Sequence, residues 1–119
     1  MNSMGKYVKA GNTGEFKDGS KKKVTIDGQE ILLARVGNIY YAIGNRCAHM
    51  GGDLSLGVLE GNIVTCPRHG SQFDVRDGKN IRWMKGSGLF AAVGRTLKSP
   101  RPVPKYNVKV EGDTILIEV

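Results

Sequence analysis

Two short runs of sequence carry most of the chemical information in this chain: CAHMGG over residues 47–52 and CPRHGS over residues 66–71. Together they contain every cysteine and every histidine of the 119 residues, which are Cys47, His49, Cys66 and His69. Thiolates and imidazoles are strong ligands for soft and borderline metal ions. Because all of them fall within two short segments, the sequence predicts one metal centre with two sulfur and two nitrogen ligands.

The order of the ligands indicates the type of centre. A zinc finger pairs like with like, as Cys-x₂₋₄-Cys and His-x₃₋₅-His. Here each run supplies one cysteine and one histidine, so a structural Cys₂His₂ zinc module fits poorly. A mixed pair in each run suits a binuclear [2Fe-2S] cluster in which one iron binds both thiolates and the other binds both imidazoles.

Composition sets the broad class of the protein. Hydrophobic residues make up 39% and charged residues 24% of a chain long enough for one hydrophobic core, which predicts a single globular domain over residues 1–119. The first residues lack the apolar segment of a signal peptide, and no apolar run is long enough for a membrane helix. We therefore expect a cytoplasmic protein without membrane association. In a reducing compartment the two cysteines favour metal binding over a disulfide.

The formal net charge of +7 favours acidic partners through long-range attraction. Nucleic acid is one candidate, but the longest cationic run is Lys21-Lys22-Lys23 and aromatic residues are only 7%. No stacking or helix-in-groove pattern accompanies the charge, so we expect no nucleic-acid binding. A dedicated docking patch and an evenly basic, solvated surface both remain open.

The remaining sequence has the pattern of an all-β protein. Short β-rich runs alternate with turn residues, and Asp27-Gly28 between two such runs is typical of a type I′ hairpin. Residues 81–99 show no clear pattern, and prolines 100, 102 and 104 favour an extended path. We expect strands at residues 7–9, 23–26, 30–34, 39–43, 56–59, 63–65, 72–75, 106–110 and 114–119.

With these features the chain resembles the Rieske family. The resemblance includes Gly51 after the first histidine, Pro67 and Gly70 around the second, and the closing run over residues 106–113. It implies an all-β Rieske fold, with antiparallel sheets forming a base and a two-loop cluster-binding subdomain at approximately residues 44–75. By this resemblance Cys47 and Cys66 bind one iron, and His49 and His69 bind the outer iron near the surface.

The resemblance also bears on the reduction potential. High-potential relatives carry an additional disulfide between the loops, at positions that correspond to Gly52 and Arg68 here, so this brace is absent. Ser71 corresponds to a serine whose hydroxyl donates to a bridging sulfide, whereas Phe73 replaces a hydrogen-bonding tyrosine. One donor retained and one lost imply a potential of about −150 to +50 mV.

No histidine remains for a mononuclear iron site or for general base catalysis once the cluster is bound, so no catalytic residue is assigned. The resemblance implies a one-electron carrier, a Rieske-type ferredoxin that passes electrons from a flavin-dependent reductase to an oxygenase or another redox acceptor, with docking at the cluster tip. The small Rieske-like subunit of an assimilatory nitrite reductase is the alternative.

Overall fold

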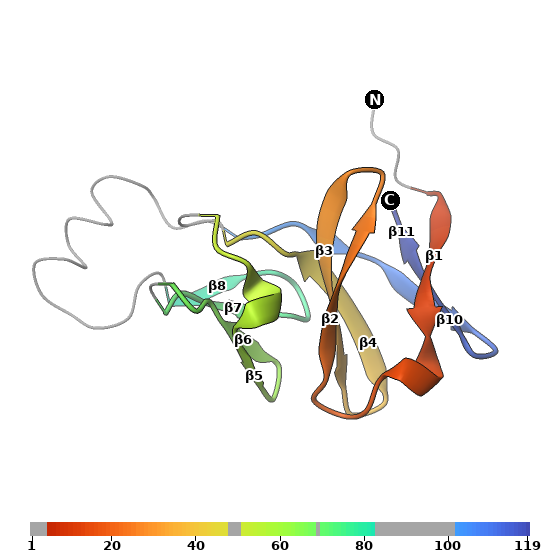
Figure 1. Ribbon diagram of the computed structural model, residues 1–119, viewed down its shortest axis with the longest axis horizontal. Coiled ribbons are helices and arrows are strands. Elements are labelled where there is room, and N and C mark those ends of the chain that lie inside the picture. Colours follow the sequence, from red (N-terminus) through yellow and green to blue (C-terminus); the bar gives the residue numbers. More distant parts are fainter. Residues whose placement is uncertain (1–4, 48–50, 69, 83–101) are drawn as a thin grey trace, which may run out of the picture.

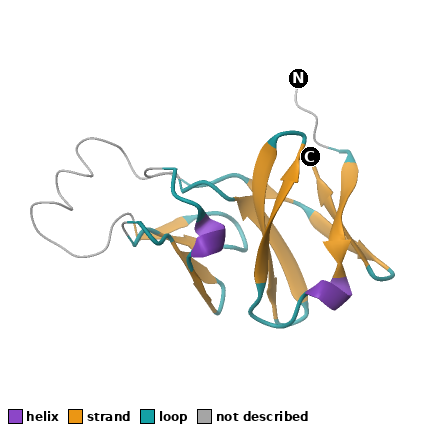
Figure 2. Ribbon diagram, in the orientation of Figure 1, coloured by secondary structure: helices purple, strands orange, loops and turns teal. Residues whose placement is uncertain are grey.

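The regular secondary structure of the described part of the chain is almost entirely β-strand (Figure 1). The computed structural model describes residues 5–47, 51–68, 70–82 and 102–119. These residues form three antiparallel sheets, with two short 3₁₀ helices, η1 (Thr13–Glu15) and η2 (Leu54–Leu56), between strands (Figure 2). The expected all-β fold is confirmed.

Two of the sheets form the base. The first has the spatial order β1 (Tyr7–Asn12), β11 (Thr114–Glu118) and β10 (Val108–Glu111). The second has the order β2 (Lys21–Ile26), β3 (Gln29–Val36), β4 (Ile39–Gly44) and β9 (Lys105–Tyr106). The third sheet lies on the other side of the second and has the order β5 (Val58–Glu60), β6 (Ile63–Thr65), β7 (Gln72–Asp74) and β8 (Asn80–Arg82) (Figure 1).

The hairpin of β2 and β3 forms as the sequence predicts. Asp27 and Gly28 adopt φ angles of 50° and 77°, which are the left-handed values that a type I′ turn requires. The turn sets the register, in which Ile26 pairs with Gln29 and Lys21 with Ala34. The long hairpin then continues into β4, whose residues Ile39 to Gly44 pair with Val36 to Ile31.

β3 has buried side chains on both of its faces. Its four central residues, Ile31 to Ala34, are all fully buried, because the second sheet lies between two hydrophobic cores. Leu32 and Ala34 belong to the core shared with the third sheet, whereas Ile31 and Leu33 belong to the core shared with the first sheet. Successive side chains of a strand point to opposite faces, so one continuous apolar run supplies both cores.

One predicted strand is wrong at its start. Leu56 was expected in a strand over residues 56–59, but it ends η2 and the strand begins at Val58. The side chain of Asp53 accepts a hydrogen bond from the backbone N–H of Ser55, which stabilises the 3₁₀ turn in place of an extended strand.

The predicted strand positions 7–9, 30–34, 63–65 and 114–118 lie within strands of the structure. Residues 83–101, which include Trp83 and Phe90, lie outside the described residues. Among the described residues, no helix is long and apolar enough to cross a bilayer.

Candidate metal centre

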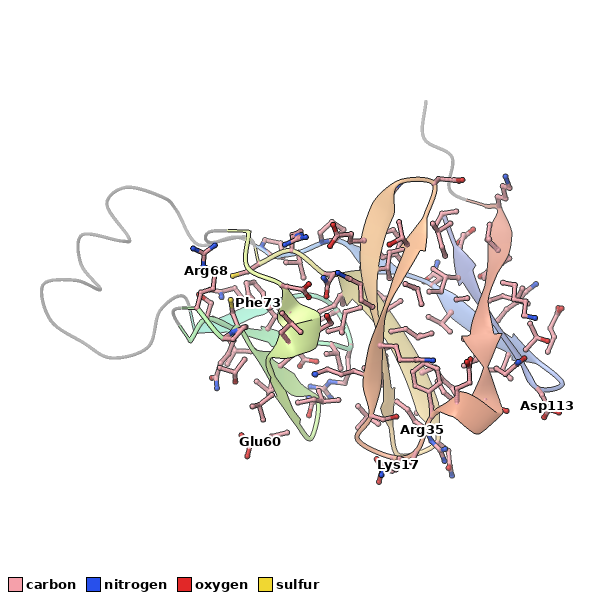
Figure 3. The ribbon with its side chains drawn as sticks, in the orientation of Figure 1. Lys17, Arg35, Glu60, Arg68, Phe73 and Asp113 are labelled. Carbon is pink, nitrogen blue, oxygen red and sulfur yellow. The ribbon has the colours of Figure 1, made fainter. Side chains whose placement is uncertain are left out.

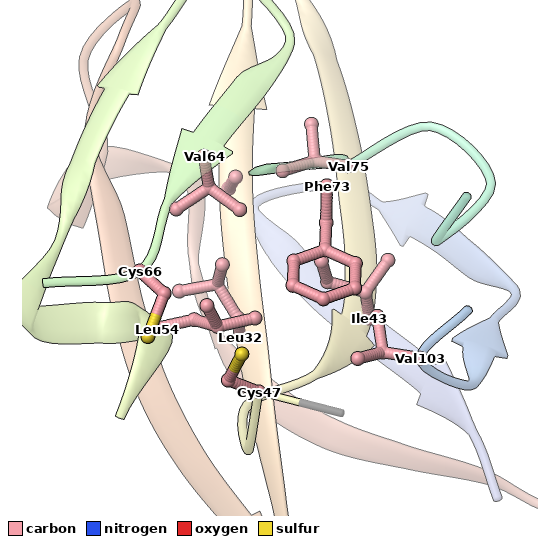
Figure 4. Close-up of a cluster of buried hydrophobic side chains, with 10 residues drawn as sticks. Leu32, Ile43, Cys47, Leu54, Val64, Cys66, Phe73, Val75 and Val103 are labelled. Carbon is pink, nitrogen blue, oxygen red and sulfur yellow. The ribbon is translucent and has the colours of Figure 1, made fainter. Parts of the chain in front are cut away.

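Cys47 and Cys66 lie in loops that follow β4 and β6, at the junction of the second and third sheets. Each residue is 3% exposed, and both belong to one hydrophobic core. Figure 4 shows both sulfur atoms at the same end of this core, on the side away from Val75. The two thiols are not joined in a disulfide. The expected pairing of the two cysteines in space is therefore present.

The two cysteine loops have the same backbone hydrogen bonds. In the first, the N–H of Cys47 donates to the carbonyl of Gly52 (2.7 Å), and its carbonyl accepts from the N–H of Gly51 (2.8 Å). In the second, the N–H of Cys66 donates to the carbonyl of Ser71 (2.7 Å), and its carbonyl accepts from the N–H of Gly70 (3.1 Å). Each cysteine thus begins a closed turn of the same length.

A glycine in the left-handed conformation closes each turn. Gly51 has a φ of 73° and Gly70 a φ of 76°, values that residues with a side chain rarely adopt. Both glycines stand four residues after the cysteine, so the shared pattern is Cys-x₃-Gly. This repeat is visible in the sequence, but the sequence analysis named Gly51 and Gly70 separately and did not recognise two equivalent loops.

The first loop contacts the second directly. A Cβ built on Gly52 would lie 2.7 Å from Sγ of Cys66 and 3.0 to 3.1 Å from the side-chain carbons of Arg68, so only glycine fits there without a shift. Gly52 and Arg68 are therefore neighbours, as expected from the positions of the disulfide in high-potential relatives. The glycine leaves room for the backbone of one loop to approach the thiol of the other.

A polar network holds the base of the first loop. Asn45, which is fully buried, donates its side-chain N–H to the carboxylate of Asp53 (2.8 Å) and accepts from the backbone N–H of Ser55 (2.9 Å). Lys23 of β2 donates to the same carboxylate (3.1 Å). Burial alone would raise the pKa of Asp53, but the hydrogen bonds from Ser55, Asn45 and Lys23 lower it below the usual range. Sequence reasoning missed this network, because the contacts of Asn45 and Lys23 with Asp53 depend on how the loop folds against β2 and no local pattern specifies them.

Asp74, the last residue of β7, is a second buried carboxylate surrounded by hydrogen-bond donors. Its carboxylate accepts hydrogen bonds from the backbone and side chain of Arg76 and from the side-chain amide of Asn62 (2.9 Å). These bonds, of which the one from the Arg76 side chain matters most, lower the pKa of Asp74 to about 2. The carboxylate is thereby kept ionised while its side chain is only 8% exposed.

Two other residues from the sequence analysis are buried near the thiols. Ser71 ends the second loop and is fully buried. Phe73 lies two residues further on β7, also fully buried, in the core that contains both cysteines (Figure 4). The predicted ligands His49 and His69 lie outside the described residues. The described residues nevertheless fit a cluster, because two buried thiols that are not joined in a disulfide lie at the same end of one core in equivalent loops (Figure 4).

The comparisons with known proteins agree with this geometry. A family model described as the Rieske [2Fe-2S] domain matches residues 6–107. The chain belongs to the Rieske [2Fe-2S] domain family. Members of this family bind one Rieske-type cluster, so the expected cofactor is confirmed and a zinc module is not supported.

Relatives of this Rieske protein match over almost the full length of both chains. The ferredoxin component of the naphthalene 1,2-dioxygenase/salicylate 5-hydroxylase systems of Ralstonia sp is 36% identical, covering 95% of each chain. The ferredoxin component of the naphthalene 1,2-dioxygenase system of Pseudomonas aeruginosa is 32% identical, covering 96% of each.

A solved structure shows the same likeness. The ferredoxin of carbazole 1,9a-dioxygenase from Nocardioides aromaticivorans IC177 matches with a TM-score of 0.77 and 30% identity, over 93% of this chain and 95% of that one. These relatives are named as ferredoxins, which carry electrons and are not the catalytic subunits. The expectation of a ferredoxin-type electron carrier is confirmed.

Proposed function

We propose that this Rieske ferredoxin accepts single electrons from a flavin-dependent reductase and passes them to the oxygenase of a multicomponent dioxygenase system. The observation that supports it most is the pair of buried cysteines, not joined in a disulfide, at equivalent positions of two matching loops. The full-length likeness to ferredoxin components of dioxygenase systems supports the choice of partners.

In this proposal Cys47 and Cys66 bind one iron, and His49 and His69 bind the other. When bound, the [2Fe-2S] cluster supplies a one-electron redox centre whose two imidazole ligands raise its potential above that of all-cysteine clusters. The chain's own residues would position it: Gly51 and Gly70 close the two loops, and the hydroxyl of the buried Ser71 would donate a hydrogen bond to the cluster. The oxygenase docks at the cluster tip, because electron transfer requires the imidazole ligands to approach the acceptor.

Residues 1–119 form one domain in this proposal, with the cluster-binding subdomain at approximately residues 44–75. We expect the protein in the cytoplasm, without a membrane or nucleic-acid partner. The lysine run supports the absence of nucleic-acid binding, since each of its three side chains contacts another group of the same molecule. Lys21 donates to the carbonyl of Ser55 (2.7 Å), Lys22 pairs with Glu15 (3.2 Å) and Lys23 pairs with Asp53 (3.1 Å).

The experiment has two stages. The protein as isolated should be red-brown with a reducible visible spectrum, and titration with dithionite should consume one electron per two iron atoms. The reduced protein is then mixed with the oxidised oxygenase component of a naphthalene dioxygenase system, and its reoxidation is followed by stopped-flow absorbance. Cys66→Ser serves as the control that should lose the cluster.

A colourless protein with stoichiometric zinc would contradict the proposal at the first stage. Copurification with a large sirohaem-containing chain would instead favour the alternative, the small subunit of an assimilatory nitrite reductase. The likeness to dioxygenase ferredoxins over the whole chain favours the first assignment.

A further inference from the structure

Most charges around the two cysteine loops are neutralised within the molecule. Arg46 pairs with Glu30 (2.9 Å) and donates to the carbonyl of Gly51 (3.2 Å), and Asp53 pairs with Lys23. Glu60 is exposed, but it is the last residue of β5 and pairs with Ile63, at the opposite end of β6 from the second loop (Figure 3). Among the described residues of the two loops themselves, one charge remains unbalanced, that of Arg68.

Arg68 is exposed and makes no ion pair or hydrogen bond with the described residues, yet its stem is held in place. It stands two residues after Cys66 in the second loop. Its Cγ and Cδ pack over Gly52 of the first loop, where a built Cβ would lie only 3.1 and 3.0 Å from them. The packing of the stem places the guanidinium above the junction of the two loops, with its N–H groups facing solvent.

We propose that Arg68 is a docking residue that binds a carboxylate on the acceptor protein, so that the acceptor surface facing the cluster tip is acidic. A guanidinium without an internal partner offers two parallel N–H donors to a carboxylate. The net charge of +7 acts in the same direction, by attracting an acidic surface from a distance. This inference rests on the proposed function, because it concerns the partner of the same cluster.

A charge at the rim of an interface mainly changes the association rate and its dependence on salt. Replacing Arg68 would also change the reduction potential, and hence the driving force, by altering the charge near the cluster. The two effects are separable with oxidants of opposite charge. A change in driving force alters the rates with both oxidants in the same direction, whereas a local charge alters them in opposite directions.

The test follows oxidation of the dithionite-reduced protein by stopped-flow absorbance. The oxidants are hexacyanoferrate(III), an anion, and tris(1,10-phenanthroline)cobalt(III), a cation. At low ionic strength, Arg68→Glu should slow the reaction with the anion by about fivefold and accelerate the reaction with the cation, and both effects should shrink at about 1 M salt. Arg68→Gln should give intermediate rates.

Lys17→Glu is the matched control. It changes the net charge by the same amount, and Lys17 is an exposed residue between η1 and β2, on the part of the molecule far from Arg68 (Figure 3). We expect it to change either rate by less than about twofold. Iron content and the visible spectrum confirm that each variant retains the cluster.

Poly-L-glutamate tests carboxylate binding directly. It should slow the reaction of the wild-type protein with hexacyanoferrate(III) and have little effect on Arg68→Glu. Equal effects of poly-L-glutamate on both proteins, or equal rates for Arg68→Glu and Lys17→Glu, would overturn the role of Arg68 and leave the electron-carrier function intact. A reduced wild-type protein that reacts with neither oxidant would overturn both.

Discussion

At the scale of single residues, burial distinguishes the position that we propose to affect the cluster from the one that we propose to contact a partner. Ser71 and Phe73 are fully buried, whereas Arg68 is exposed. A buried hydroxyl close to a cluster can affect its potential, because a hydrogen bond to sulfur stabilises the more negative, reduced state. The exposed guanidinium acts on the approach of another protein.

Ser71→Ala tests the contribution of the buried hydroxyl. We expect the potential to fall by about 60 mV, equivalent to ~1.4 kcal/mol for one electron, because the reduced cluster loses a hydrogen-bond donor. Protein-film voltammetry measures the shift. Ser20→Ala, in the loop before β2, is the control and should leave the potential unchanged. An unchanged potential in Ser71→Ala would exclude the hydroxyl as a donor to the cluster.

At the scale of elements, the metal centre is made from two equivalent turns pressed against each other. Each turn is closed by the same two backbone hydrogen bonds and a left-handed glycine. The first turn is fastened to β2 by one ionised carboxylate, that of Asp53, which binds Asn45 and Lys23. A second carboxylate, Asp74, joins the end of β7 to Asn62 and Arg76, at the end of the β6–β7 hairpin opposite the second turn. In the proposal the turns supply the ligands.

Gly52→Ala tests the contact between the turns. The new methyl group would meet the sulfur of Cys66 at 2.7 Å, so the loops must separate, at a cost of about 1–3 kcal/mol. We expect a lower iron content and faster loss of visible absorbance on warming. Gly14→Ala is the control, since a Cβ there has no neighbour within 4 Å. Equal iron retention in the two variants would show that the loops are not closely packed.

The lowered pKa of Asp74 predicts that the stability of the fold depends on pH. Its pKa is lowered from 3.8 to about 2 in the folded state, so its stabilisation is fully present above about pH 5 and is lost as the pH falls towards 2. The contribution is at most about 2 kcal/mol. Urea unfolding at pH 6 and pH 3 should therefore show a smaller loss of stability in Asp74→Asn than in the wild type.

The control for this measurement is Asp113→Asn, at the exposed turn between β10 and β11 (Figure 3). This variant should keep the pH dependence of the wild type. If Asp74→Asn and Asp113→Asn show the same loss between pH 6 and pH 3, the pairing of Asp74 with Arg76 does not stabilise the fold.

At the scale of the whole molecule, the second sheet separates two hydrophobic cores that stabilise different parts of the protein. One contains Cys47 and Cys66, and the other joins the two sheets of the base. Adjacent residues of β3 therefore stabilise different parts of the protein. The charge is also unevenly distributed along the chain, since no Asp or Glu occurs between Asp77 and Glu111.

Leu32→Ala and Leu33→Ala form a matched pair that tests this division. Both side chains are fully buried, so each truncation should lower the free energy of unfolding by about 2–5 kcal/mol. Only Leu32 shares a core with the cysteines, so only Leu32→Ala should also release iron faster under native conditions. The measurements are urea unfolding and the rate of iron transfer to a chelator. Equal release rates would mean that the two cores are not independent.

The sequence by itself determined the chemistry of the centre and most of the strands. Ligand identity is a local property, so Cys47, His49, Cys66 and His69 indicated the cluster without any structure. The hairpin turn at Asp27-Gly28 was equally predictable, because its φ angles depend on two adjacent residues. The 3₁₀ turn at Leu56 was not, because a hydrogen bond to Asp53 overrides the strand pattern there.

Only the tertiary structure decided which groups meet across the chain. In the folded chain Gly52 lies against Cys66, and Asn45 donates a hydrogen bond to Asp53. The side chains of the lysine run bind groups of the same molecule, whereas Arg68 has no partner among the described residues. Such contacts depend on the register and packing of strands that are distant in sequence, so no local pattern specifies them. The ligand types therefore follow from the sequence, whereas the surroundings of the cluster and the surface facing its partner follow from the fold.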